Sequence, residues 1–338
     1  MKKYEYIYNE ILKQISANKL NIGEKIPSEN VLSKKYNISR VTIRKSLDLL
    51  EQNGYIKKSQ GKESVLISNE GHKKIVLLVL HNLFRYIFTD IIKNIEKILR
   101  ENDIGLFISC SYNDRHIEEQ ILQYHSRNIV GIVIEPTQTS FIKEDDNISP
   151  VYNILQEVPT ICLNTKFPKF DLPYLILNDK KNSSNLTRKL IEKNKKRFLL
   201  VFKTDDIQGF DRLKGITKVL NTHKIQNHIV EFSTENENTV IDEIIPIYQD
   251  YQPDCIMFYN DEFASEFLYK QKINFNEVTI TGFDDSNFSN GEPFKFLSPS
   301  HPQGKMGEDA ALNLIKLING KKAKSIIYDS VIKEKEEL

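Results

Sequence analysis

The most constraining feature of this sequence is a regular alternation of short apolar runs and helix-period segments after residue 74. The runs form two series: 75–80, 106–109, 129–134, 160–163 and 174–177, then 198–202, 228–232, 255–258 and 278–281. Helical periodicity lies between them, as at 183–192, 209–220, 262–269 and 304–318. Continuous apolar runs are typical of strands buried on both faces, and strand–helix alternation predicts parallel sheets covered by helices. Two series predict an α/β unit with two lobes.

Polar residues follow most of these runs, at the strand ends where parallel sheets bind ligands. The candidate binding residues found in this way are Arg85, Tyr86, Asn113, Glu135, Lys203, Asp206, Tyr259, Asn260 and Asp284. Charged and amide groups satisfy hydroxyls, and aromatic rings cover an apolar ring face, so this composition fits a sugar. No glycine-rich phosphate loop appears. Each residue type is also common in turns and helix caps, and Asp261 and Asp285 are expected to be structural.

The first 68 residues have a different pattern, which predicts a winged helix-turn-helix. The expected elements are a helix over 4–18, two helices capped by Ser28 and Ser39, and strands over 55–58 and 64–67. The third helix buries one apolar face, and Gly54 ends it. A helix of this kind fits the major groove of DNA, and its N-terminal residues reach the base edges.

Basic residues support this interpretation. Arg40, Thr42 and Arg44 lie at the start of the third helix, away from its apolar face, and Lys45 is expected to contact phosphate. Residues 1–68 carry 13 basic and 7 acidic side chains, a balance of +6. The rest of the chain carries 34 basic and 39 acidic ones, a balance of −5. A polyanionic partner is therefore expected at the N-terminal part only.

Residues 4–67 resemble the DNA-binding domain of the GntR family of bacterial repressors. The motifs that carry the resemblance are Pro27-Ser28-Glu29, the Ser39–Arg44 stretch and Gly54-Tyr55-Ile56. The resemblance implies DNA contacts by Arg40, Thr42 and Arg44, and by Gln60 and Gly61 in the wing.

The sequence departs from the GntR pattern at two positions. Asn30 stands where the family often has an arginine that touches DNA, and Glu63 replaces the second glycine of the wing. A carboxylate near phosphate is repulsive, and a residue other than glycine restricts the turn.

From Lys74 to Ile326 the chain is similar to the LacI/periplasmic-binding-protein sensors, and most of all to the arabinose-responsive repressors, which join such a sensor to a GntR head. Among the shared stretches are Gly131–Thr137, Asp205–Gly209 and Gly282–Ser286. The resemblance implies an effector site that includes Glu135, Asn164, Lys203, Asp206, Gln208, Arg212, Asn260 and Asp284. The strand-end residues Arg85, Tyr86, Asn113 and Tyr259 complete the expected site. Asn164 stands where some members have Asp. The resemblance also implies a homodimer that represses at a double-stranded operator and is released by a sugar, L-arabinose.

The expected domains are 1–68, a polar linker over 69–74, and a sensor and dimerisation domain over 75–338. The cysteines Cys110, Cys162 and Cys255 are far apart in apolar runs, which favours buried thiols in a reducing cytoplasm. No signal peptide, membrane span, cofactor or enzymatic activity is expected. Three alternatives stay open: another sugar effector, a sugar-metabolising enzyme fused to a DNA reader, and a transport binding protein, which the absent signal peptide disfavours.

Overall fold

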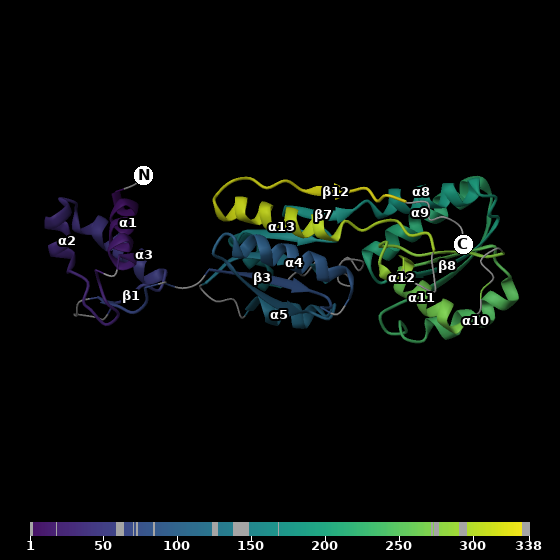
Figure 1. Ribbon diagram of the computed structural model, residues 1–338, viewed down its shortest axis with the longest axis horizontal. Coiled ribbons are helices and arrows are strands. Elements are labelled where there is room, and N and C mark those ends of the chain that lie inside the picture. Colours follow the sequence, from purple (N-terminus) through teal and green to yellow (C-terminus); the bar gives the residue numbers. More distant parts are fainter. Residues whose placement is uncertain are drawn as a thin grey trace. The chain divides into compact units, whose positions relative to one another are not determined.

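The computed structural model describes residues 3–17, 19–58, 64–69, 71, 74–83, 85–123, 128–137, 149–167, 169–271, 273, 277–290 and 296–332 (Figure 1). The chain divides into two compact units. One comprises Met1–Ile75 together with Asp103–Gly105 and Ser126–Val130, and the other comprises Val76–Asn102, Leu106–His125 and Gly131–Leu338.

Three helices and a small antiparallel sheet form the first unit: α1 (Lys3–Ser16), α2 (Glu29–Tyr36), α3 (Arg40–Gln52), β1 (Ile56–Lys57) and β2 (Val65–Leu66). The Ser28 hydroxyl accepts a hydrogen bond from the Val31 N–H, and the Ser39 hydroxyl accepts one from Thr42, so both serines cap their helices. An apolar core between the helices fixes this arrangement. An isolated bridge from Lys25 to Val65 adds a third segment to the sheet. The predicted winged helix-turn-helix is confirmed.

Six strands form the first sheet of the second unit: β3 (Ile75–Leu80), β4 (Gly105–Cys110), β5 (Ile129–Ile134), β6 (Thr160–Leu163), β7 (Tyr174–Leu177) and β12 (Ile326–Tyr328). Their order is β12-β7-β6-β5-β3-β4. The accompanying helices are α4 (Ile87–Arg100), α5 (Arg115–Gln123), η1 (Pro150–Asn153), α7 (Ile154–Glu157) and α13 (Gln303–Ile318). Helices α4 and α13 pack together on one face and α5 lies on the other (Figure 1). We call this sheet with its helices lobe 1.

The close packing of α13 on α4 depends on a glycine. A Cβ atom at Gly307 would lie 2.4 Å from the backbone oxygen of Ile91, so only glycine lets the two helices approach this far. The C-terminal part of the chain is thereby held in lobe 1, where β12 pairs in parallel with β7. The sequence pattern predicts α13 but not β12.

Four parallel strands form the second sheet: β8 (Arg197–Lys203), β9 (Gln226–Phe232), β10 (Cys255–Phe258) and β11 (Thr279–Thr281), in the order β11-β10-β8-β9. Helices α8 (Asp179–Glu192) and α9 (Ile207–His223) cover one face, and α10 (Val240–Tyr251) and α11 (Asp261–Lys270) cover the other (Figure 1). The short helix α12 (Asn287–Asn290) follows β11. We call this part lobe 2, and the predicted two-lobe α/β fold is confirmed.

Helix α8 begins four residues before its predicted start because its first two turns carry polar residues that are nevertheless buried. Asn182, Ser183 and Ser184 are each less than 10% exposed. The Ser184 hydroxyl donates to the backbone oxygen of Gly215 in α9, and Asn182 donates to the Ser330 hydroxyl. Apolar periodicity does not predict a helix where the buried face is polar, as it is in these first turns of α8.

Candidate effector site and nucleic-acid interface

A small cavity lies where the strand ends of the two lobes meet. Its lining consists of Arg85, Tyr86, Ile87, Gln208, Arg212, Tyr259, Asn260, Asp284 and His301, and its volume is about 20 Å³. Arg85 and Tyr86 come from the segment between β3 and α4, Ile87 is the first residue of α4, and the next two come from α9. Tyr259 and Asn260 follow β10, Asp284 follows β11, and His301 precedes α13. A volume of this size is close to the room that one water molecule needs.

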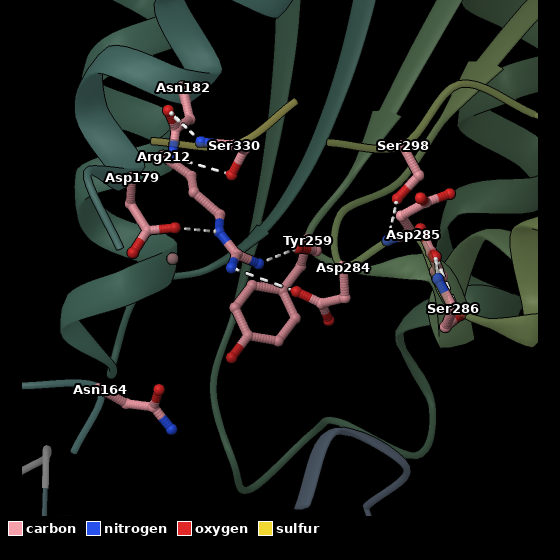
Figure 2. A network of polar contacts seen from close by, with 12 residues as sticks. Asn164, Asp179, Asn182, Arg212, Tyr259, Asp284, Asp285, Ser286, Ser298 and Ser330 are labelled. Carbon is pink, nitrogen blue, oxygen red and sulfur yellow. Dashed lines mark hydrogen bonds and ion pairs between the residues drawn. The ribbon is translucent and has the colours of Figure 1, made fainter. Parts of the chain in front are cut away.

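Arg212 is the centre of the polar network that forms one wall of this cavity (Figure 2). Its Nε donates to Asp179 Oδ1 at 2.7 Å, its Nη1 donates to the Tyr259 carbonyl at 2.8 Å, and its Nη2 donates to Asp284 Oδ1 at 3.5 Å. The guanidinium carbon also lies 4.5 Å from the centre of the Phe283 ring, a cation–π contact. The side chain of Arg212 is 3% exposed.

The charges in this network hold one another in place. Burial alone lowers the pKa of Arg212, but the Asp179 and Asp284 carboxylates outweigh it, and the pKa is raised. Burial raises the pKa of Asp179, although Arg212 opposes that shift. Two buried carboxylates thus share one buried guanidinium. Removing any one of these three groups would leave an uncompensated charge away from water, which is strongly destabilising.

Tyr86 joins this network from the other lobe. Its hydroxyl donates to Asp284 Oδ2 at 2.6 Å, and its ring packs edge-on against Phe288. Burial and then the Asp284 charge raise the pKa of Tyr86 well above its ordinary value, so it is a neutral donor. Asp284 has φ 102°, in a region that favours glycine. Strain of this kind is concentrated at functional sites.

Two predicted binding residues also cap helices, as their residue types allow. Asp206 Oδ1 accepts from the Gly209 N–H at 2.6 Å at the start of α9, and its Oδ2 accepts from the Tyr259 hydroxyl at 2.5 Å. Asn260 Oδ1 accepts from the Phe263 N–H at 3.1 Å at the start of α11. The Asn260 side chain still lines the cavity. Asp206 does not line it and supports Tyr259 instead.

Lys203 and Arg85 are linked by Glu237, a residue that the sequence analysis missed. Glu237 Oε1 accepts from Arg85 Nη2 at 2.8 Å, and Oε2 accepts from Lys203 Nζ at 2.6 Å. Glu237 lies in the turn between β9 and α10 of lobe 2, and its ion pair with Arg85 of lobe 1 connects the two lobes.

Glu135 and Asn164 form a separate polar group in lobe 1. Asn164 Nδ2 donates to Glu135 Oε1 at 2.8 Å, and the His81 N–H donates to Glu135 Oε2 at 3.2 Å. Among the described residues the buried Asn164 Oδ1 finds no hydrogen-bond partner. Figure 2 shows Asn164 apart from the Arg212 cluster. Asn113 has φ 57° in the turn after β4, and like Glu135 and Asn164 it does not line the cavity.

His301 lines the cavity but was not predicted from the sequence. It is 8% exposed, and neither ring nitrogen has a hydrogen-bond partner within the described part of the chain. Burial lowers its pKa to about 4, so at pH 7 the ring is neutral and offers one donor and one acceptor. It lies outside every periodic segment, and the return of the chain from lobe 2 to α13 brings it to the cavity.

The predicted nucleic-acid interface is an exposed basic surface at the start of α3. Arg40, Arg44, Lys45 and Asn30 are exposed, and Thr42 is half-buried against Ser39. Gln60, Gly61 and Glu63 lie outside the described residues. Val41 was not predicted, yet it is 66% exposed on the same turn, where a valine suits a thymine methyl group.

Glu29 of α2 is ion-paired with Arg44, one of the arginines that are predicted to contact DNA bases. Its carboxylate accepts from Arg44 Nε and Nη2, both at 2.9 Å, and lies 3.9 Å from Arg40 Nη2. The hydrogen bonds from Arg44 lower the pKa of Glu29. The Arg44 side chain is still 57% exposed, so this pair orients the guanidinium without covering it.

Within the described part of the chain no cluster of His, Cys, Asp or Glu is suited to a metal ion. None of the described helices is both long and apolar enough to cross a membrane.

Comparison with known proteins agrees with both parts of the chain. Residues 3–65 match the family described as bacterial regulatory proteins, gntR family. Over its whole length the chain is similar to the arabinose metabolism transcriptional repressor of Halalkalibacterium halodurans, with 30% identity over 97% of this chain and 94% of the relative.

Solved structures share the fold of the second unit. A periplasmic binding protein/LacI transcriptional regulator from Alkaliphilus metalliredigens, in complex with D-xylulofuranose, has a TM-score of 0.66 at 19% identity, over 77% of this chain and 97% of its own. The Cra transcriptional dual regulator from Pseudomonas putida, in complex with fructose 1-phosphate, has a TM-score of 0.66 at 16% identity, over 78% of this chain and 99% of its own.

Proposed function

Because the chain belongs to the family of arabinose metabolism transcriptional repressors, we propose that it represses sugar-utilisation genes and that L-arabinose bound at the Arg212 cavity releases it from its operator. It is a transcriptional repressor with a GntR-type DNA-binding domain. The effector, the site residues and the homodimer are parts of the proposal.

The observation that carries the effector proposal is the chemistry of the cavity wall. Arg212 supplies donors, Asp284 supplies acceptors, and neutral His301 supplies one of each. Tyr86 and Tyr259 add aromatic faces that can cover a sugar ring. A sugar hydroxyl both donates and accepts, so it suits this mixture better than a purely cationic or purely apolar pocket does.

Size determines how the sugar must enter. The cavity volume of about 20 Å³ is far below the ~300 Å³ of an ordinary small-molecule pocket, so side chains or lobes have to move. The hydrogen bond from Tyr86 to Asp284 and the ion pair from Arg85 to Glu237 hold the lobes together at this point. We propose that sugar hydroxyls replace such contacts and so change the relation of the lobes.

A change in the lobes can reach the DNA through a dimer. We propose a homodimer whose two heads bind the half-sites of a roughly palindromic operator. Arg40, Thr42 and Arg44 would reach base edges, and Lys45 and Asn30, with Gln60 and Gly61 of the wing, would add contacts. Coupling of about 1–3 kcal/mol per site is typical of such switches. The coupling is reciprocal, so operator DNA would weaken sugar binding by the same factor.

The decisive experiment is binding of the full chain to a labelled operator from its own promoter region during titration with L-arabinose, D-xylose, D-ribose and fructose 1-phosphate. Release by L-arabinose alone is expected. Release by another sugar of the panel would support the same repressor architecture with that sugar as the effector. Chemical turnover of the bound sugar would favour a fused sugar-metabolising enzyme. Operator binding that no sugar changes would overturn the proposal.

Two variants separate the two activities. Arg40→Ala removes an exposed side chain and is expected to weaken specific operator binding by about 10- to 100-fold, with sugar binding intact. His301→Leu removes buried nitrogens that lack partners in the described part of the chain, so it is expected to leave the stability of the fold unchanged and to lower sugar affinity by about 10-fold. A loss of melting temperature in His301→Leu would indicate a structural role instead.

We further propose that residues 1–68 form the DNA-binding domain, that 69–74 form the linker and that 75–338 form the sensor. A repressor acts where the chromosome is, so we place the protein in the cytoplasm.

A further inference from the structure

Glu237 occupies a position that a ligand's anionic group would otherwise suit. Its two carboxylate oxygens take one cation each, Arg85 at 2.8 Å and Lys203 at 2.6 Å. Paired cations at these distances are the usual recognition element for carboxylates and phosphates in proteins. Arg85 also lines the cavity that we assign to the sugar.

Asp206 and Asp284, two other acids near this group, are hydrogen-bonded elsewhere, and a third, Glu262, interacts with Arg85 by charge without forming an ion pair with it. Asp206 accepts from the Gly209 N–H and from the Tyr259 hydroxyl. Asp284 accepts from Tyr86 and Arg212. Of the acids in the described part of the chain, only Glu237 is ion-paired with Arg85 and Lys203.

Burial makes this neutralisation necessary. The side chain of Lys203 is 5% exposed, and a buried ammonium without a counter-ion is strongly disfavoured. Glu237 itself is 25% exposed and comes from a turn, so its carboxylate is the member of the group that can be exchanged for another anion. With Glu237 in place, a second anion beside it would be repelled.

We propose that Glu237 makes the effector site selective for neutral sugars, because its carboxylate fills the anion subsite of Arg85 and Lys203 and thereby excludes sugar acids and sugar phosphates. The proposal rests on the proposed function, in that the cavity has to bind a sugar. It assigns to Glu237 a role in specificity that neither the motifs nor the apolar periodicity indicated.

The test measures, by calorimetry on the full chain, the affinities for L-arabinose and for its acid, L-arabinonate. Wild-type protein is expected to bind the neutral sugar and to reject the acid. In Glu237→Gln the amide keeps the volume of the side chain but no longer neutralises Arg85 and Lys203, so these cations can attract the carboxylate of the ligand. The ratio of acid affinity to neutral affinity should therefore rise by about 10-fold or more. Added salt should reduce that gain, since it depends on charge.

The matched control is Glu235→Gln. Glu235 is an exposed acid in the same turn, and its backbone N–H donates to the Ser233 hydroxyl. Glu235→Gln therefore removes the same charge without touching either cation. Its affinity ratio should stay at the wild-type value. Adding Arg85→Met to Glu237→Gln should abolish the gain for the acid.

The outcomes are distinct. If Glu237→Gln binds L-arabinose and keeps the wild-type affinity ratio, the role of Glu237 in selectivity is refuted. If wild-type protein binds no sugar at all, the proposed function fails instead. Should Glu237→Gln be too unstable for calorimetry, its melting temperature with L-arabinonate decides: a larger rise than in wild type supports the proposal, and an equal rise refutes it.

Discussion

Replacing Arg212 by methionine tests the polar network at the heart of the sensor. Methionine keeps a long side chain but removes the guanidinium, which leaves Asp179 and Asp284 without their shared cation. Arg212 is 2% exposed and the two acids are 7% exposed, so water does not reach them easily. Breaking a buried ion pair by removing one partner costs about 3–5 kcal/mol.

The magnitude also follows from the protonation of one carboxyl group. Without Arg212, Asp179 can avoid a buried charge by taking up a proton, starting from an ordinary pKa of 3.8. Protonating a carboxyl group of ordinary pKa costs about 1.4 kcal/mol for each pH unit above that pKa. Keeping Asp179 protonated therefore costs about 4 kcal/mol at pH 7 and about 2 kcal/mol at pH 5. The variant's pKa for Asp179 is raised further than in wild type, so the loss of stability should shrink as the pH falls.

The assay is urea unfolding followed by far-UV circular dichroism at pH 7 and pH 5, since the sequence has no tryptophan. For the sensor transition we expect a lower midpoint with an unchanged slope. The double variant Arg212→Met/Asp179→Asn removes one stranded charge and should recover a large part of the loss. The reasoning is refuted if Arg212→Met loses less than about 1 kcal/mol at pH 7, or if its loss is the same at pH 5.

Three further predictions address other parts of the chain. Glu29→Gln frees Arg44 from its bidentate partner, so specific operator affinity should fall by about 10-fold, while affinity for unrelated DNA, measured by the same gel assay, should not fall. Burial, and then the charge of Asp284, raises the pKa of Asp261 to about 7, so the wild-type free energy of unfolding should fall by about 3 kcal/mol from pH 5 to pH 8. Urea titrations of Asp261→Asn should lack this part of the pH dependence. Gly215→Ala would place a Cβ 2.4 Å from the Lys180 carbonyl oxygen, and a melting temperature equal to that of wild type would contradict the close packing of α8 on α9.

Much of the architecture is encoded in local patterns that the sequence displays directly. The caps at Ser28 and Ser39 act within three residues, and the isoleucines of α1 lie one turn apart on one buried face. The apolar runs that become β8 and β10 are buried on both faces of a sheet, so no other residues are needed to recognise them. The helices of the first unit and nearly every strand could therefore be predicted from residues that are neighbours in the sequence.

The candidate site was predicted in part for the same reason. Polar residues at strand ends pointed to Arg85, Tyr86, Tyr259 and Asp284, because parallel strands bring their carboxyl ends to one edge. That rule does not say which of these residues meet. It placed Glu135 with them, whereas the structure pairs Glu135 with Asn164 in lobe 1.

Only the tertiary structure decided which distant segments come into contact. Tyr86 meets Asp284 across 198 residues, and Arg85 meets Glu237 across 152. His301 reaches the cavity because the chain returns from lobe 2 to build α13 and β12 in lobe 1. Periodicity records which side of an element is buried, but the partner of a buried charge depends on how the elements are stacked. The sequence by itself thus determined most of the helices and strands and the class of fold, and the topology determined which charges neutralise one another in the site.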